Sequence, residues 1–269
     1  MSEKLNPTSI TRDSWDFTTD HFSILLKIIA IPFILSVSLE GFIEIYYGGN
    51  PTPYAKAGVD GLYCVLEAMW GVRWLRYLLE PPRQNKYFMA PFRFGRHEFK
   101  YASYAFILMI PIMLDDIAIG LNLPSIVTAG LLVLIFAFLF ITIRFEFIFP
   151  AIAISHATSF SMAWRKSKPY WGSLIISFVQ SLVIMIPVLA VLSVIGFIAF
   201  VGVWAFGLAD ISAWTAHDGF DALFQRSPII LGLYLIIKEG IWFLFQALLL
   251  TIIGLYYRDA SVKIASRKI

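Results

Sequence analysis

The sequence predicts an all-α fold: a polytopic helical membrane protein with about six transmembrane helices and one amphipathic helix at the cytoplasmic membrane surface. The chain has 269 residues, of which 59% are hydrophobic and 14% are charged, and its mean hydropathy is +0.75. Soluble globular proteins are about 45–50% apolar and about 25% charged, so a buried soluble core does not explain this composition. Apolar runs of membrane-spanning length, and the distribution of Lys and Arg between them, do explain it.

Apolar stretches of spanning length recur along the chain. A helix needs about 20 mainly apolar residues to cross a bilayer core about 30 Å thick. Four stretches meet this requirement clearly: residues 101–121, 126–148, 174–201 and 229–256. Residues 22–47 also meet it, although the run is interrupted by Lys27, Pro32, Glu40 and Glu44. The sixth candidate, residues 59–79, suits either a span or an interfacial helix, because it carries Asp60, Glu67, Arg73 and Arg76.

Basic residues favour six spans, because Lys and Arg gather in cytoplasmic loops near helix ends. They are concentrated in residues 73–100, 144–168 and 258–268, and they are sparse in residues 48–56, 120–124 and 202–228. Six spans with both termini in the cytoplasm place every basic cluster on one side of the membrane. Five spans would place the N-terminus outside, and this alternative stays open because that end contains only Lys4 and Arg12.

Polar segments flank one membrane domain. We predict a polar cytoplasmic N-terminal segment in residues 1–20, a single helical transmembrane domain in residues 21–257 and a basic cytoplasmic tail in residues 258–269. The first segment is mixed in charge and has no apolar core before residue 22, so it is not a secretory signal peptide.

Composition and motifs exclude several classes of function. The net charge of +3 is too balanced for a nucleic-acid-binding protein, whose basic residues form one dominant patch. A single cysteine, Cys64, excludes an internal disulfide, a four-cysteine zinc site and a CxxC redox pair. The sequence contains no phosphate-binding loop, dinucleotide fingerprint, serine-hydrolase elbow or HExxH pair. We therefore predict no catalytic residue, no metal site and no cofactor.

Ionisable residues within the spans are the candidates for a polar site, because each costs roughly 2.5–3.5 kcal/mol on insertion scales. Glu40 and Glu44 lie one helical turn apart and share a face. The full set is Glu40, Glu44, Glu67, Asp115, Asp116, Lys238 and Glu239. One interpretation is an outward-facing cation or proton site; the other is a set of interfacial residues near water or paired with a base. For Glu67 we expect a charge partner on another span, either Lys27 or Lys238.

The segment after the fourth span is predicted to lie on the cytoplasmic membrane surface. Pro150 breaks the span, and residues 151–168 place apolar and polar side chains on opposite faces of one amphipathic helix. Phe160 and Trp164 are four residues apart and can pack together. The residues predicted to meet lipid headgroups here and in the loop at 80–99 are Arg93, Arg96, Phe160, Trp164, Arg165, Lys166 and Lys168.

Residues of this segment also carry a family resemblance. The sequence resembles the cytoplasmic signature of six-span bacterial inner-membrane proteins at Arg144, Pro150, Ala151, Ala153, Ser159, Ala163, Trp164, Arg165, Ser167 and Lys168. That group includes YciC-like proteins and the membrane domain attached to some glycerophosphodiester phosphodiesterases. A Gly-Asn pair often follows the signature in the family, whereas Pro169 and Tyr170 follow it here. The resemblance implies a bacterial inner (plasma) membrane location, but no activity, because the soluble phosphodiesterase domain has no counterpart in this sequence.

Three classes of function are compatible with the sequence. The absence of catalytic motifs favours an integral inner-membrane protein that is not an enzyme and acts as a scaffold, an envelope factor or an accessory subunit. The intramembrane acids favour a small transporter or channel as the alternative. The third class, a lipid-processing membrane enzyme, needs converging nucleophile, base or metal ligands. Expected partners are membrane lipids, with anionic headgroups on the cytoplasmic side, and other membrane proteins, but not nucleic acid.

Overall fold

A computed structural model gives the arrangement of most of the chain. It describes residues 5–48, 51–80, 94–120, 141–156, 158–205 and 228–266, together with Gly130, Val133 and Phe138. All regular secondary structure in these described residues is helical, in agreement with the predicted all-α class.

The helices are α1 (Pro7–Asp20), α2 (Phe22–Tyr47), α3 (Pro53–Leu79), α4 (Arg96–Gly120), α6 (Ile148–Ala153), α7 (Phe160–Ser167), the short 3₁₀ helix η2 (Lys168–Tyr170), α8 (Trp171–Ala205) and α10 (Pro228–Ser266).

Side chains satisfy the free N–H groups at several helix starts. Asn6 accepts a hydrogen bond from the Thr8 amide at the start of α1, and Ser159 accepts one from the Met162 amide at the start of α7. Such caps stabilise a helix by typically about 1 kcal/mol.

Three helical stretches are long and apolar enough to cross a membrane: Phe22–Tyr47, Phe160–Ala199 and Pro228–Val262. The first has the bounds predicted for the first span, the second overlaps the predicted span 174–201 up to residue 199, and the third contains the predicted span 229–256. α3 covers the predicted span 59–79, and α4 covers residues 101–120 of the predicted span 101–121, but their charged residues make them more polar. Most of the predicted span 126–148 lies outside the described residues.

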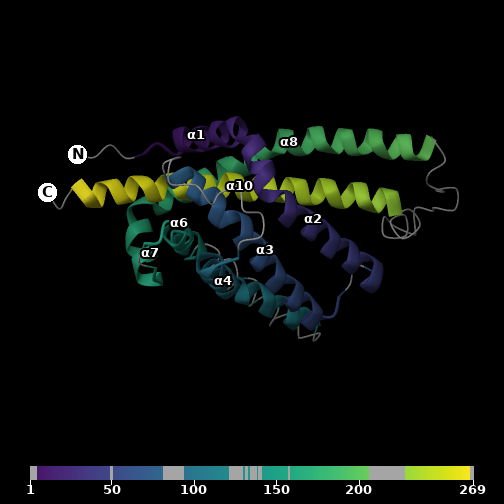
Figure 1. Ribbon diagram of the computed structural model, residues 1–269, viewed down its shortest axis with the longest axis horizontal. Coiled ribbons are helices and arrows are strands. Elements are labelled where there is room, and N and C mark those ends of the chain that lie inside the picture. Colours follow the sequence, from purple (N-terminus) through teal and green to yellow (C-terminus); the bar gives the residue numbers. More distant parts are fainter. Residues whose placement is uncertain are drawn as a thin grey trace.

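Helix α10 lies at the centre of the arrangement. It contacts α1, α2, α3, α6, α7 and α8. Figure 1 shows α8 and α10 running side by side in opposite directions, while α2, α3 and α4 diverge from them. α1 and the C-terminal end of α10 lie at the same end of the molecule, together with α6 and α7. α10 is thus the helix against which the others are positioned.

Polar contacts join α1 to this centre. Thr11, Ser14 and Thr18 of α1 are buried, while the charged side chains of the helix are exposed. The Thr11 hydroxyl donates to Gln180 of α8 over 3.0 Å, and the Thr18 hydroxyl lies 3.4 Å from that of Thr251 of α10. The segment predicted to be a polar N-terminus therefore forms a helix that packs its Ser and Thr face on α8 and α10.

The predicted helix over residues 151–168 is wrong in its bounds, because the chain breaks into α6 and α7. The Ser155 amide donates to the Ile152 carbonyl and the His156 amide to the Ala151 carbonyl. With Ser155 at a φ of 60°, this pair of bonds is the Schellman motif that ends many helices. Ser159 then starts α7. The sequence pattern missed the break because the position that usually carries glycine is a serine here.

We expect Ser155→Gly to raise stability, because a left-handed conformation costs an L-residue roughly 1–2 kcal/mol. A gain of up to about 1 kcal/mol is expected, since glycine also loses more entropy on folding. Thermal unfolding in lipid nanodiscs measures it. Ser155→Ala is the matched control: it removes the same hydroxyl but keeps the left-handed cost, so it should give no gain. Equal stability of the two variants would contradict this assignment.

Candidate functional site

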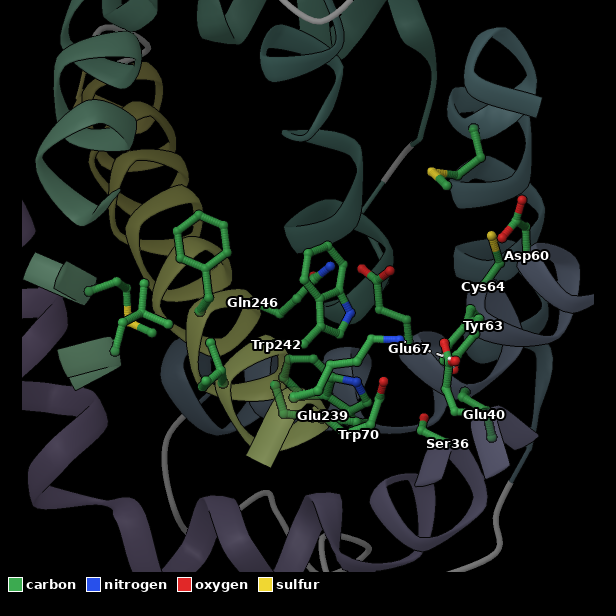
Figure 2. A pocket seen from close by; sticks show the side chains of 18 of the residues that line it. Ser36, Glu40, Asp60, Tyr63, Cys64, Glu67, Trp70, Glu239, Trp242 and Gln246 are labelled. Atoms are coloured by element: carbon green, nitrogen blue, oxygen red, sulfur yellow. Dashed lines mark hydrogen bonds and ion pairs between the residues drawn. The ribbon is translucent and has the colours of Figure 1, made fainter. Parts of the chain in front are cut away.

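A cavity of about 600 Å³ lies between α2, α3, α4, α8 and α10 (Figure 2). Its polar lining residues come from three of these helices: Ser36 and Glu40 from α2, Asp60, Tyr63, Cys64 and Glu67 from α3, and Lys238, Glu239 and Gln246 from α10. Trp70 and Trp242 line the same cavity. Among the described lining residues, four carboxylates face one basic side chain, Lys238. The cavity is therefore acidic.

Both oxygens of Glu40 have a partner. One oxygen lies 3.1 Å from the Lys238 Nζ, and the other accepts a 2.8 Å hydrogen bond from the Tyr63 hydroxyl. The two partners come from α10 and α3, so this cluster links three helices. A carboxylate with a hydrogen bond and an ammonium partner avoids most of the penalty of leaving water.

Glu67 has a different partner from the one predicted. Its Oε1 accepts a 2.8 Å hydrogen bond from the Tyr101 hydroxyl of α4. The bases expected beside it are engaged elsewhere or point away, because Lys238 pairs with Glu40 and Lys27 is exposed. Gly71 makes room for Tyr101: a Cβ at this position would lie 3.0 Å from the Tyr101 hydroxyl oxygen.

Glu239 is the least satisfied carboxylate of the cavity. Its exposed fraction is only 3%, and its Oε2 has no hydrogen-bond partner among the residues that the structure describes. The Ser36 hydroxyl, which also lines the cavity, is likewise buried and has no hydrogen-bond partner among the described residues. A buried carboxylate oxygen without a partner is costly unless a proton or a cation neutralises it. The Oε2 of Glu239 therefore needs a proton or a cation as its partner in the cavity.

A second cavity, also of about 600 Å³, adjoins the first. The two share Glu67, Met109, Trp242, Phe245 and Gln246 as lining residues. In Figure 2, Glu67 from α3 lies near Trp242 and Gln246 from α10. Glu67 therefore sits at the boundary between the two cavities.

The predicted polar residues are partly brought together. Glu40, Glu67, Lys238 and Glu239 line the first cavity, whereas Glu44 does not. The side chains of Asp115 and Asp116 lie outside the described part of the structure. Sequence reasoning missed Asp60, Tyr63, Tyr101 and Gln246 as site residues. The signal for two of them was present, because Asp60, Tyr63 and Glu67 follow the spacing of one helical face.

The predicted lipid-interface residues have mixed surroundings. Phe160 and Trp164 both pack on the ring of Phe145, at centroid distances of 4.9 and 5.7 Å. The Arg144 guanidinium lies 3.4 Å from the centre of a Trp164 ring. Arg96, Trp164, Arg165 and Lys168 are exposed, as expected for headgroup contacts, and Arg93 lies outside the described residues. Trp164 is thus exposed, although its ring also packs on Phe145 and contacts the Arg144 guanidinium.

Lys166 points into the protein instead of toward lipid. Its ammonium donates to the Tyr257 hydroxyl over 3.1 Å and lies 4.3 Å from the centre of that ring. His156 lies 3.0 Å from the same hydroxyl. Burial and the neighbouring Lys166 lower the pKa of His156 below its ordinary value. These contacts attach the segment between α6 and α7 to α10.

No group of three or more His, Cys, Asp or Glu side chains with metal-binding geometry occurs among the described residues. Comparisons of the chain with protein-family models, with curated proteins and with solved structures find no match.

We expect Tyr101→Phe to destabilise the protein by about 1 kcal/mol, because Glu67 loses its hydrogen-bond donor inside the bundle. Tyr104→Phe on the same helix is the control, since Tyr104 has a ring contact with Phe160 but its hydroxyl makes no hydrogen bond to the described residues. Urea or thermal unfolding in nanodiscs measures both. In a Tyr101→Phe, Glu67→Leu double variant, the total loss should be smaller than the sum of the losses of the two single variants, because each substitution removes the same hydrogen bond. Full additivity would argue against the bond.

Proposed function

We propose that the protein is a bacterial inner-membrane protein that crosses the membrane six times and has both termini in the cytoplasm. The distribution of Lys and Arg supports this topology. The position of α1 and the end of α10 at one end of the molecule is consistent with it. The resemblance of residues 144–168 to YciC-like proteins supports the bacterial inner membrane. Exposed Arg165 and Lys168 are suited to contact anionic headgroups.

Within this topology we propose that the protein binds a cation in the acidic cavity and moves it across the membrane. The observation that carries the proposal is the buried Oε2 of Glu239, which has no partner among the described residues in a cavity where four carboxylates face one lysine. Intramembrane acids that line a cavity mark ion and substrate pathways in membrane proteins. A purely structural set would pair each carboxylate, as the protein does for Glu40.

Charge movement in proteoliposomes tests this function. We expect concentration jumps of H⁺, Na⁺, K⁺ or tetramethylammonium on a solid-supported membrane to give a current for at least one of the four cations. Glu239→Gln and Glu67→Gln should each reduce it about tenfold or more, because each removes a buried charge partner of the cation.

Glu44→Gln is the matched control, since Glu44 belongs to the same acidic set by sequence but does not line the cavity. Its current should equal that of the unmodified protein. Absence of a current with all four cations, or an unchanged current in Glu239→Gln, would refute the proposal. Gel filtration and thermal unfolding of each variant show whether a loss of current reflects misfolding.

A role as an accessory subunit is the second candidate, and α8 favours it. Large apolar side chains along this helix are exposed, including Val183, Ile186, Val191, Val194, Phe197 and Ile198. Lipid covers such a surface as well as a protein partner does. Native mass spectrometry from lipid particles separates the two, because only an accessory subunit retains a stoichiometric protein partner.

A further inference from the structure

The two adjoining cavities differ in chemistry. The first contains the carboxylates of Glu40, Asp60, Glu67 and Glu239. The second is lined mainly by aliphatic and aromatic side chains from α4, α8 and α10, such as Leu108, Ile175, Phe178, Leu249 and Ile253. Together they form a site with an acidic part and an apolar part.

The polar groups of the second cavity are few and include two carboxylates. They are Glu67, Thr142, Glu146 and Gln246. The two carboxylates, Glu67 and Glu146, come from α3 and from the segment before α6. Of these two carboxylates, Glu67 also lines the first cavity.

The two cavities follow one another along α10. Lining residues of this helix run from Lys238 to Gln246 in the first cavity and from Trp242 to Ile253 in the second. At a rise of 1.5 Å per residue, the combined stretch from Lys238 to Ile253 spans about 22 Å. The site is therefore much longer than an inorganic cation requires.

We propose that the ligand is an amphiphilic organic cation, with its ammonium head among the carboxylates of the first cavity and its hydrocarbon tail in the second. This inference rests on the proposed cation-binding function and specifies its substrate class. Glu239 and Glu67 neutralise the head. Trp70 and Trp242 line the acidic cavity and offer the aromatic faces that ammonium groups prefer.

Other ligand classes fit the two cavities less well. A metal ion or a proton leaves the apolar cavity without an occupant. A neutral lipid leaves the buried oxygen of Glu239 without a partner, and an anionic amphiphile meets the repulsion of several carboxylates. A cationic head joined to an apolar tail satisfies both parts at once.

Binding of alkyltrimethylammonium ions tests the inference. The full chain in zwitterionic nanodiscs is titrated with tetramethyl-, butyl-, hexyl- and octyltrimethylammonium, and Kd is measured by calorimetry. Signals from empty nanodiscs are subtracted to remove partitioning into lipid. We expect Kd to fall by about fourfold for each added methylene until the apolar cavity is filled, which is the usual value of burying one methylene.

Two sets of variants separate the head from the tail. Glu239→Gln should weaken binding of every homologue, including tetramethylammonium. Ala105→Leu, which narrows the second cavity at a buried position, should leave tetramethylammonium unchanged and remove most of the chain-length dependence. Val179→Phe makes the same test from a position that is 52% exposed, so at least one tail variant keeps the fold.

The outcomes distinguish the inference from the function on which it rests. If tetramethylammonium binds and Kd does not fall as the alkyl chain lengthens, the amphiphile inference is overturned, while the cation-binding function stands. Equal affinity for octyltrimethylammonium and for an uncharged octyl glycoside would also overturn the inference. If no homologue binds, and the four inorganic and small organic cations give no current, both the inference and the proposed function fail.

Discussion

Buried polar groups need partners, and in this protein α10 supplies several of the partners that join one helix to another. Along its length Lys238 pairs with Glu40 of α2, Thr251 accepts from the Trp74 indole of α3, and the Tyr256 hydroxyl lies 3.0 Å from that of Ser177 of α8. Hydrophobic burial drives little association between helices that lipid already surrounds, and interhelical hydrogen bonds in membranes contribute about 0.6 kcal/mol each. The arrangement therefore depends on several modest contacts that share one helix.

The acidic cavity is where this pairing is incomplete. Glu40 has two partners and Glu67 has one, while the buried Oε2 of Glu239 has none among the described residues. A protein selected only for stability gains nothing from an unpaired carboxylate oxygen, because an apolar side chain would replace Glu239 at lower cost. The unpaired oxygen of Glu239 is the physical reason for assigning a ligand to the cavity.

Sequence patterns predicted the long-range features better than the local ones. The bounds of α2 followed from hydropathy alone, and the helices α8 and α10 contain the predicted apolar runs, because length and composition determine whether a helix suits a bilayer. Four site residues followed from the cost of placing charge in a span. Tyr63 and Tyr101 were missed, since a tyrosine is common in such helices and becomes a donor only when another helix brings a carboxylate to it.

The break at Ser155 shows the same limit on a local scale. Residues 151–168 carry a convincing amphipathic pattern, and nothing in that pattern reports the left-handed conformation of one serine. The conformation depends on backbone hydrogen bonds and on the attachment of the following segment to Tyr257, through Lys166 and His156. Those contacts join residues about 100 positions apart, so pattern recognition within a short window does not detect them.

The cluster of Glu40, Tyr63 and Lys238 has a consequence for how the chain is made. The ribosome completes Glu40 about 200 residues before Lys238, which corresponds to roughly 10–40 s at ordinary rates of synthesis. Tyr63 follows only 23 residues after Glu40, within roughly 1–5 s. The tyrosine is therefore the first internal partner available to the carboxylate during biogenesis, and it can hold α2 against α3 until the lysine arrives.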